Sequence, residues 1–304
     1  MRQAEYRPEL NLRPLALTAL SIVGAAFVAV GASFYRRPFA TLRALRRARL
    51  LVAGVVERYA LVRGVPIRYL EAGPRDGEPI VLVHGLGDSA ESWSGVLPAL
   101  ACDHRVIVPD LAGFGRAPIP PEGMHFSVLT AYFTDFLAAI GVERAVLVGN
   151  SLGGAVAMRH AARHPGQVAR LFLLNTAGLP IGDVAIFLPQ NRDQARELVA
   201  VSVGAQRRLP LFILDDLIRR ATEPARRAYL DSPERTDVDA DLAHLTMPIT
   251  IVWGERDRLI PLSVAERIRE AQPTAELITL PNAGHIPQSD APRQVATIIR
   301  ERLR

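Results

Sequence analysis

The sequence contains no lysine, so all 36 of its basic residues are arginines. It has a single cysteine, Cys102, which excludes an intramolecular disulfide. A metal-binding motif is also missing. His160 and His164 lie one helical turn apart, but with no evident third ligand we interpret them as core or solvated residues. The sequence therefore predicts neither a disulfide framework nor a metal, and no motif requires a cofactor.

Excess charge is missing from most of the chain, although the net charge is +5. Residues 1–49 hold nine arginines against Glu5 and Glu9, so the remainder carries 27 arginines against 29 acidic residues. A nearly neutral main domain argues against a nucleic-acid partner. We interpret the paired arginines 207–208, 219–220 and 226–227 as a solvated helix face; binding a lipid headgroup is the alternative.

Charge is absent altogether from 21 consecutive residues, Leu15 to Tyr35. As a helix this stretch would reach about 30 Å, the thickness of a bilayer's hydrocarbon core. We therefore predict a tail and transmembrane helix over residues 1–35, giving a single-pass membrane protein. The alternatives are a signal peptide cleaved near Val30-Gly31-Ala32 and a buried core helix. A signal peptide's apolar region is usually shorter, which favours the retained span.

Residues 36–54 follow as a basic segment, predicted to form a juxtamembrane helix. Six arginines within 36–49 alternate with apolar residues, so the helix could face anionic headgroups while its apolar edge lies in the interface. We thus expect bilayer contacts through residues 15–35 and 36–49; a solvated linker is the alternative. By the positive-inside rule the main domain is cytoplasmic, but the three arginines and amino terminus before the span leave the periplasmic side open.

Downstream of residue 54, short apolar runs alternate with stretches of helical periodicity. Residues 56–62 and 65–72 predict a hairpin, because Arg63-Gly64 between them is a two-residue turn signal. The predicted buried strands are 79–84, 105–110, 145–148, 169–175, 249–253 and 276–280. The predicted helices are 127–140, 155–163, 263–271 and 293–302. This alternation requires an α/β fold, a mostly parallel sheet with helices on both faces, formed by residues 55–178 and 248–304.

Residues 179–247 interrupt the alternation with helical stretches at 193–203 and 211–221. An insertion at the carboxyl edge of a parallel sheet lies over the place where such sheets bind ligands, so we predict a helical cap, or lid. Its apolar runs, 184–188 and 209–214, either line an acyl pocket or form the cap's own core.

The stretch Ala145 to Gly154, AVLVGNSLGG, joins a predicted strand to a predicted helix. Small residues two before and two after Ser151 allow a sharp turn that leaves the serine strained and its hydroxyl exposed at the sheet edge. This is the pattern of a nucleophile elbow. A serine hydroxyl needs a base, and Asp257 and His285 follow the last two predicted strands.

From these motifs, residues 55–304 resemble the α/β-hydrolase superfamily, whose order of serine, acid and histidine they share. The resemblance implies a triad in which Ser151 attacks a carbonyl, His285 accepts and returns the proton, and Asp257 orients the imidazole. Asn175 stands where some relatives carry the acid, and Glu255 is interpreted as a solvated loop residue.

The resemblance also implies an oxyanion hole formed by the backbone N–H groups of Leu86 and Leu152. His84, in the same loop as Leu86, is interpreted as structural. We expect Gly85, Asn150 and Ile286 to contact substrate.

The whole arrangement resembles membrane-anchored monoacylglycerol lipases and small phospholipases A. It implies hydrolysis of acyl esters, of monoacylglycerol, lysophospholipid or phospholipid, through an acyl-enzyme. The main alternative is a carbon–carbon bond hydrolase of aromatic ring-cleavage products, which shares Gly149-Asn150-Ser151. Such relatives often have Trp after the catalytic histidine, where this chain has Ile286. A third alternative is a ligand-sensing or scaffold protein without turnover.

Overall fold

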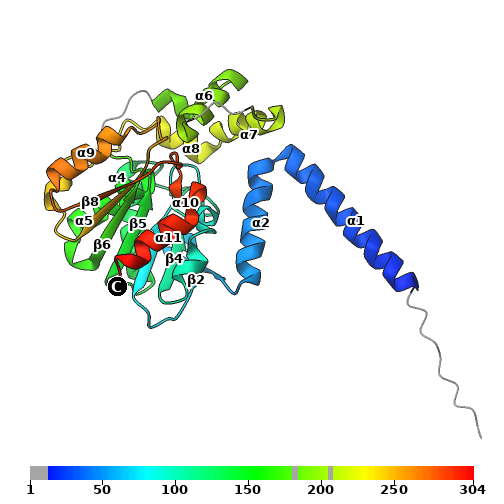
Figure 1. Ribbon diagram of the computed structural model, residues 1–304, viewed down its shortest axis with the longest axis horizontal. Helices are drawn as coiled ribbons and strands as arrows, with labels where there is room; N and C mark the ends of the chain where they lie inside the picture. Colours follow the sequence, from blue (N-terminus) through cyan, green and yellow to red (C-terminus); the bar gives the residue numbers. More distant parts are fainter. Residues whose placement is uncertain (1–12, 180–183, 205–207) are drawn as a thin grey trace, which may run out of the picture.

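An eight-stranded sheet forms the centre of the computed structural model, which describes residues 13–179, 184–204 and 208–304, with the side chains of 13–23 and 184–185 excepted. The strands are β1 (Val56–Val62), β2 (Val65–Ala72), β3 (Pro79–Val83), β4 (Arg105–Pro109), β5 (Ala145–Asn150), β6 (Val168–Leu174), β7 (Ile249–Gly254) and β8 (Glu276–Leu280). Their order is β1-β2-β4-β3-β5-β6-β7-β8 (Figure 1). Each strand predicted from the sequence is present within two residues of its predicted start.

The sheet is mostly parallel, as predicted, with an antiparallel hairpin at one edge. β1 pairs with β2, and β2 runs antiparallel to β4, whereas β4, β3, β5, β6, β7 and β8 are parallel neighbours. Arg63 and Gly64 both have positive φ, as a tight hairpin turn requires. The chain reverses direction across the sheet between β3 and β5, so the loops that follow these strands flank a crevice at the carboxyl edge.

The sheet separates two buried clusters, which explains why its central strands are continuously apolar. Along β5, Ala145 and Leu147 pack on one face, while Val146 and Val148 pack on the other. α4 (Phe126–Ala139), α5 (Leu152–Arg163) and α9 (Leu262–Ala271) cover the first face. α3 (Leu97–Leu100), α10 (Pro287–Asp290), α11 (Pro292–Glu301) and the short helix η1 (Ala90–Trp93) lie on the second.

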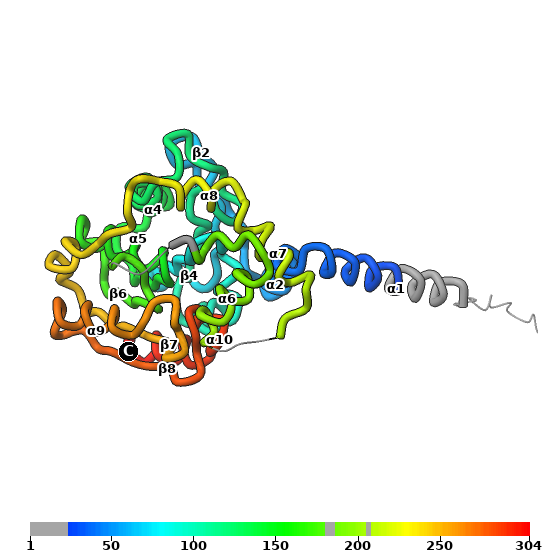
Figure 2. The backbone as a smooth tube through the Cα atoms, turned by 90° about the horizontal axis from the view of Figure 1, so that it is seen from above, coloured from blue at the N-terminus to red at the C-terminus, as the bar shows by residue number. Residues whose placement is uncertain are grey.

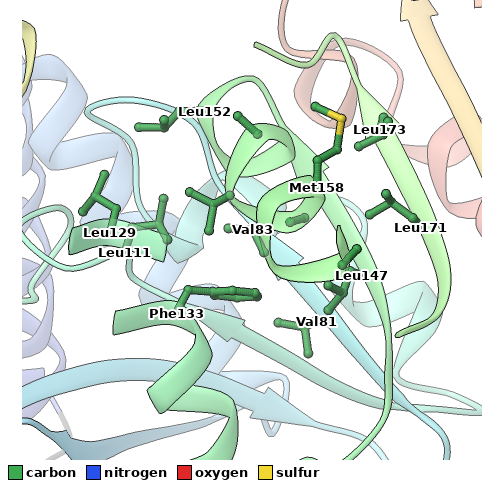
Figure 3. Close-up of a cluster of buried hydrophobic side chains, with 14 of the residues drawn as sticks. Val81, Val83, Leu111, Leu129, Phe133, Leu147, Leu152, Met158, Leu171 and Leu173 are labelled. Carbon is green, nitrogen blue, oxygen red and sulfur yellow. The ribbon is translucent and has the colours of Figure 1, made fainter. Parts of the chain in front are cut away.

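The first cluster anchors the helix that follows the predicted nucleophile. Leu152 and Met158 of α5 lie among side chains from three parallel strands, including Val83, Leu147 and Leu173 (Figure 3). Each of these side chains is at most 3 % exposed. Tight packing fixes the position of α5, and with it the turn at its amino end.

The segment predicted as a cap lies above the carboxyl edge of the sheet, and its described residues form three α-helices and two short 3₁₀ helices, η3 (Val184–Phe187) and η4 (Leu242–His244) (Figure 1). α6 (Arg192–Val203) and α7 (Leu211–Ala221) match the two predicted helical stretches, and α8 (Pro224–Leu230) was not predicted. The predicted apolar run 184–188 lies only partly within the described side chains. Residues 180–183 and 205–207 of the predicted cap lie outside the described residues.

Two helices precede the sheet. α1 (Arg13–Arg36) extends away from the rest of the chain, whereas α2 (Pro38–Val52) lies against it (Figures 1 and 2). Leu50 of α2 is 2 % exposed within the second cluster, and Arg47 donates to Glu57 of β1 at 2.6 Å. The solvated-linker alternative for residues 36–54 is therefore wrong: the segment is a docked helix.

Residues 1–12 of the predicted tail lie outside the described residues, and the predicted span 15–35 is described fully only from Gly24. Among the described residues, no helix combines the length and apolar character needed to cross a bilayer. The described part of α1 is exposed, with Phe27 and Val28 at 77 % and 73 %, except where its carboxyl end meets the cap. There Phe34 and Tyr35 pack against Phe212 of α7, with ring centroids 5.8 and 5.1 Å apart.

Candidate active site

Ser151 occupies a sharp turn between β5 and α5, in the conformation that the sequence predicts. Its φ is +53°, a left-handed conformation that is uncommon for residues other than glycine. The turn is possible because its neighbours lack side chains. A Cβ on Gly149 would lie 2.4 Å from the Gly153 carbonyl oxygen, and one on Gly153 would lie 2.4 Å from that of Val83. The packing of strand, helix and loop thus holds the serine in place.

The structure brings Ser151, His285 and Asp257 together at the carboxyl edge of the sheet. His285 Nε2 lies 3.0 Å from Ser151 Oγ, and His285 Nδ1 lies 2.7 Å from Asp257 Oδ2. The three residues are 7 %, 7 % and 5 % exposed, respectively, so little water screens their interactions. This geometry allows the imidazole to take the hydroxyl proton while the carboxylate stabilises the imidazolium. Glu255 is exposed, as predicted.

Four donors surround the Asp257 carboxylate. Asp257 Oδ1 accepts the backbone N–H groups of Leu259 and Ile260 at 2.8 and 3.0 Å. Asp257 Oδ2 accepts, besides His285, the side-chain amide of Asn175 at 2.7 Å. Asn175 Oδ1 in turn accepts the Gly254 N–H at 2.9 Å. We did not predict this role: the sequence showed only that Asn175 is not itself the acid.

The loop after β3 lies beside the serine, as an oxyanion hole requires. No hydrogen bond to the backbone N–H of Leu86 or Leu152 forms within the described residues. His84 holds this loop in place, because its Nδ1 lies 2.8 Å from the Gly85 carbonyl and its Nε2 accepts the Leu111 N–H at 3.0 Å. The side chain is fully buried, so its role is structural.

Gly85, Asn150 and Ile286, predicted to contact substrate, all line the pocket at Ser151. The Asn150 side chain, however, is engaged elsewhere. Its Nδ2 donates to the carbonyls of Leu174 and His285, and its Oδ1 accepts from Gln288 Nε2, each at 3.0 Å. Asn150 therefore ties the histidine loop to the elbow, which leaves it without a free amide donor for a ligand.

A pocket of about 460 Å³ opens over the serine and histidine. One wall is apolar and comes from α6 and α7, with Leu198, Val199, Ile213 and Leu217 among its residues. Phe39 and Leu42 of α2, which packs against α7, also line the pocket. The sequence did not predict that the basic segment would line this pocket, since nothing in its pattern indicates which surface it packs against.

The paired arginines of the cap do not form the uniformly solvated face that we expected. Arg219 and Arg227 are exposed, but Arg220 and Arg226 turn inward and line the pocket. Arg220 also lies over the ring of Phe39, with its Cζ 4.9 Å from the centroid. The expectation is therefore wrong for one member of each of these two pairs.

No group of three potential metal ligands occurs among the described residues. His160 is 1 % exposed and its Nδ1 lies 2.9 Å from Thr134 Oγ1. Burial lowers the pKa of the His160 imidazole to about 4, with a smaller contribution from His164. The pair is thus part of the interface between α4 and α5.

Comparison with known proteins agrees with this architecture. A family model described as the alpha/beta hydrolase family matches residues 80–298. A 2-hydroxy-6-oxo-6-(2'-aminophenyl)hexa-2,4-dienoic acid hydrolase of Metapseudomonas resinovorans is 31 % identical over 258 residues, covering 79 % of this chain and 88 % of that protein. Lipase 3 of a Moraxella species is 27 % identical over 259 residues, 79 % of this chain and 82 % of the lipase.

Among solved structures, a bacterial membrane phospholipase A is similar along nearly the whole chain. It superposes with a TM-score of 0.75 at 25 % identity, covering 95 % of this chain and 98 % of that one. The proteins that this chain resembles thus include a lipase, a membrane phospholipase A and a dienoic acid hydrolase.

Proposed function

The chain belongs to the alpha/beta hydrolase family, and from that premise we propose that it is a membrane-anchored serine hydrolase that cleaves acyl esters of lipids. The substrate class is monoacylglycerol, lysophospholipid or phospholipid. The observation that carries this proposal is a hydrogen-bonded triad at a pocket that the cap lines mostly with apolar side chains. Such a lining suits an acyl chain, whose burial contributes about 0.8 kcal/mol per CH₂.

The reaction follows from the positions of the side chains. Ser151 Oγ attacks the ester carbonyl carbon while His285 Nε2 takes the hydroxyl proton, and the N–H groups of Leu86 and Leu152 stabilise the oxyanion. The ester C–O bond then breaks, and His285 returns the proton to the leaving alcohol. Water, deprotonated by His285, hydrolyses the acyl-enzyme by the same steps in reverse, releasing the fatty acid and restoring Ser151.

Membrane attachment by residues 1–35 is supported by the apolar side chains that α1 exposes. The resemblance to a membrane phospholipase A, whose coverage of this chain includes most of this region, supports it further. On this proposal the pocket, which α2 lines, lies close to the bilayer that supplies the substrate. Arginines after the span favour a cytoplasmic domain by the positive-inside rule, and a periplasmic domain is the alternative.

A carbon–carbon bond hydrolase is the second candidate, favoured by the 31 % identity to the dienoic acid hydrolase. Against it, the residue after the histidine is Ile286, and the cap wall offers mostly apolar groups.

The purified full chain, assayed with monoacylglycerol, lysophospholipid and a dienoate ring-cleavage product, separates these candidates. We expect release of fatty acid and labelling of Ser151 by a fluorophosphonate probe, both lost in Ser151→Ala. Cleavage of the dienoate alone would overturn the proposal, and an unlabelled, inactive protein would favour the non-catalytic alternative.

A further inference from the structure

We propose that Arg220 and Arg226 form an anion subsite within the catalytic pocket, which binds the phosphate of a lysophospholipid or phospholipid headgroup. This inference rests on the proposed acyl-ester hydrolysis and narrows its substrate class, because monoacylglycerol has no phosphate. The subsite involves none of the triad or oxyanion groups.

Both guanidinium groups lie against the loop that follows β3, beside the nucleophile. Arg220 Nη2 donates to the Gly87 carbonyl at 2.6 Å, and Arg226 Nη2 lies 3.4 Å from the Leu86 carbonyl. The two side chains share the pocket with Ser151 and His285. An anion held here is therefore within the reach of a substrate whose acyl carbonyl is at the serine.

Neither arginine forms an ion pair within the described residues, although Asp88 and Glu223 act on both from a greater distance. The Nε atom of each is buried without a hydrogen-bond partner. Buried donors of this kind normally have partners, and an unpaired buried charge is costly. An oxyanion bound in the pocket beside the two guanidinium groups would supply the missing counter-charge.

The rest of the pocket entrance is also positive. Arg43 and Arg46 of α2 line it, against one acidic lining residue, Asp88, whose Oδ1 already accepts the Ser89 N–H. Burial lowers the pKa of Arg226 to about 10 and also lowers that of Arg220. A guanidinium group is charged at neutral pH. The positive charge of Arg220 lowers the pKa of Arg226 further, because the two guanidinium groups repel each other.

The neighbouring arginines supply a contrast on the same helices. Arg219 pairs with Asp216, and Arg227 pairs with Asp231 at 2.6 Å, with the Arg227 side chain 57 % exposed. In each of the pairs 219–220 and 226–227, one arginine therefore has an acidic partner and the other is directed into the pocket. A general need for solubility or surface charge does not account for the inward members.

A phosphodiester suits the subsite better than a carboxylate. Two guanidinium groups can share the oxygens of one phosphate, a geometry that Arg favours. In a glycerophospholipid the phosphate lies only a few bonds from the acyl ester, which matches a subsite beside the serine. The apolar side chains of α6 and α7 in the same pocket, Leu198, Val199, Ile213 and Leu217, receive the acyl chain.

The test compares two substrates with the same acyl chain, palmitoyl lysophosphatidylcholine and monopalmitoylglycerol, in neutral detergent micelles. We expect Arg226→Gln and Arg220→Gln to lower the ratio of kcat/KM for the phospholipid to that for the glycerol ester about tenfold or more. Arg227→Gln removes the same charge from an adjacent, exposed position, so its ratio should stay within about twofold of the unsubstituted protein.

Three outcomes would overturn the subsite. The first is an unchanged kcat/KM for both substrates in both variants. The second is an equal loss of kcat/KM on both substrates, which would mean that the arginines only hold the loop. The third is an equal shift of the ratio in Arg227→Gln.

Binding provides a separate measurement: glycerophosphocholine should raise the melting temperature of Ser151→Ala, and adding Arg226→Gln should abolish that rise. Stabilisation by a dienoate instead would assign the subsite to a carboxylate. Hydrolysis of neither ester would contradict the proposed function, whereas hydrolysis of both with no change in ratio would contradict the subsite alone.

Discussion

At the level of single residues, Asn175 shows how a position beside the triad can control it. Its amide donates to Asp257 Oδ2 at 2.7 Å, and it adopts a positive φ of 40° at the end of β6. Because the Asn175 amide contacts Asp257 Oδ2, a carboxylate at residue 175 would lie directly against Asp257. Two carboxylates at that distance cannot both stay ionised without a large cost.

We therefore predict that Asn175→Asp lowers kcat on a short-chain p-nitrophenyl ester at neutral pH by about tenfold or more, since one shared proton weakens the acid that orients His285. Asn175→Ala, which only removes a donor, should cost less. The pair of variants is compared by kcat at several pH values and by melting temperature. Full activity of Asn175→Asp at neutral pH would show that the hydrogen bond does not influence the triad.

His160 allows a prediction about stability. Its pKa is lowered by burial to about 4, whereas an unfolded chain has a histidine pKa near 6.5. Above pH 6.5 both states are neutral; as the pH falls toward 4 only the unfolded state takes up the proton, so stability is lost over that window. The loss from this group is about 3 kcal/mol at most.

Replacing His160 with Gln should remove that part of the pH dependence while keeping a polar group near Thr134. Denaturant unfolding at pH 7.5 and 4.5 measures it, and His164→Gln is the matched control one turn away. Since carboxylates titrate in the same range, the informative quantity is the difference between variants. Equal losses in the original protein and His160→Gln would exclude His160 as the cause.

At the level of elements, the sequence predicted those parts whose pattern is local. The central strands β3, β4 and β5 are mostly short apolar runs, the edge hairpin has a turn signal, and Ser151, Asp257 and His285 each follow a strand end in the family's order. What could not be predicted depends on packing between distant segments. Helical periodicity does not reveal which of Arg219 and Arg220 turns inward, because that depends on α2 lying against α7. The amide of Asn150 and the role of Asn175 depend likewise on loops more than 80 residues away.

α2 is the element whose observed contacts differ most from those predicted from the sequence. Besides Leu50 and the Arg47–Glu57 ion pair, the Phe39 N–H donates to Asp216 of the cap at 3.0 Å. The Arg47 hydrogen bond lowers the pKa of Glu57 to about 2, so the pair is charged at any working pH. One helix thus joins the sheet edge, the cap and the pocket wall.

We predict that removing residues 1–36 keeps the fold and the hydrolysis of short-chain esters, because α2 stays in place. Removing residues 1–53 should lower the melting temperature by about 5 °C or more, since it uncovers the Leu50 contacts and opens one pocket wall. Circular dichroism melts and p-nitrophenyl ester assays measure both. Equal stability and activity of the two truncations would show that α2 contributes nothing to the catalytic domain.

At the level of the whole molecule, charge and apolar surface are separated along the chain. α1 exposes apolar side chains, α2 carries arginines, and the remainder is nearly neutral. The two amino-terminal helices would therefore bind membranes by different forces. Burial of an apolar helix is insensitive to salt, whereas attraction of arginines to anionic headgroups is screened within about 3 Å at 1 M salt.

This difference predicts distinct behaviour for the full chain and for the form that lacks residues 1–36. If α1 inserts, as the proposed membrane attachment requires, the full chain should sediment with both neutral and anionic vesicles and stay bound at about 1 M salt. The truncated form should bind anionic vesicles only, and salt should release it.

Arg46→Gln in the truncated form should weaken binding further, since Arg46 is exposed and close to the pocket entrance. If the truncated form instead remained on neutral vesicles at high salt, apolar groups beyond α1 would have to enter the bilayer; Leu42 and Leu45, 39 % and 47 % exposed on α2, would then be the first positions to replace.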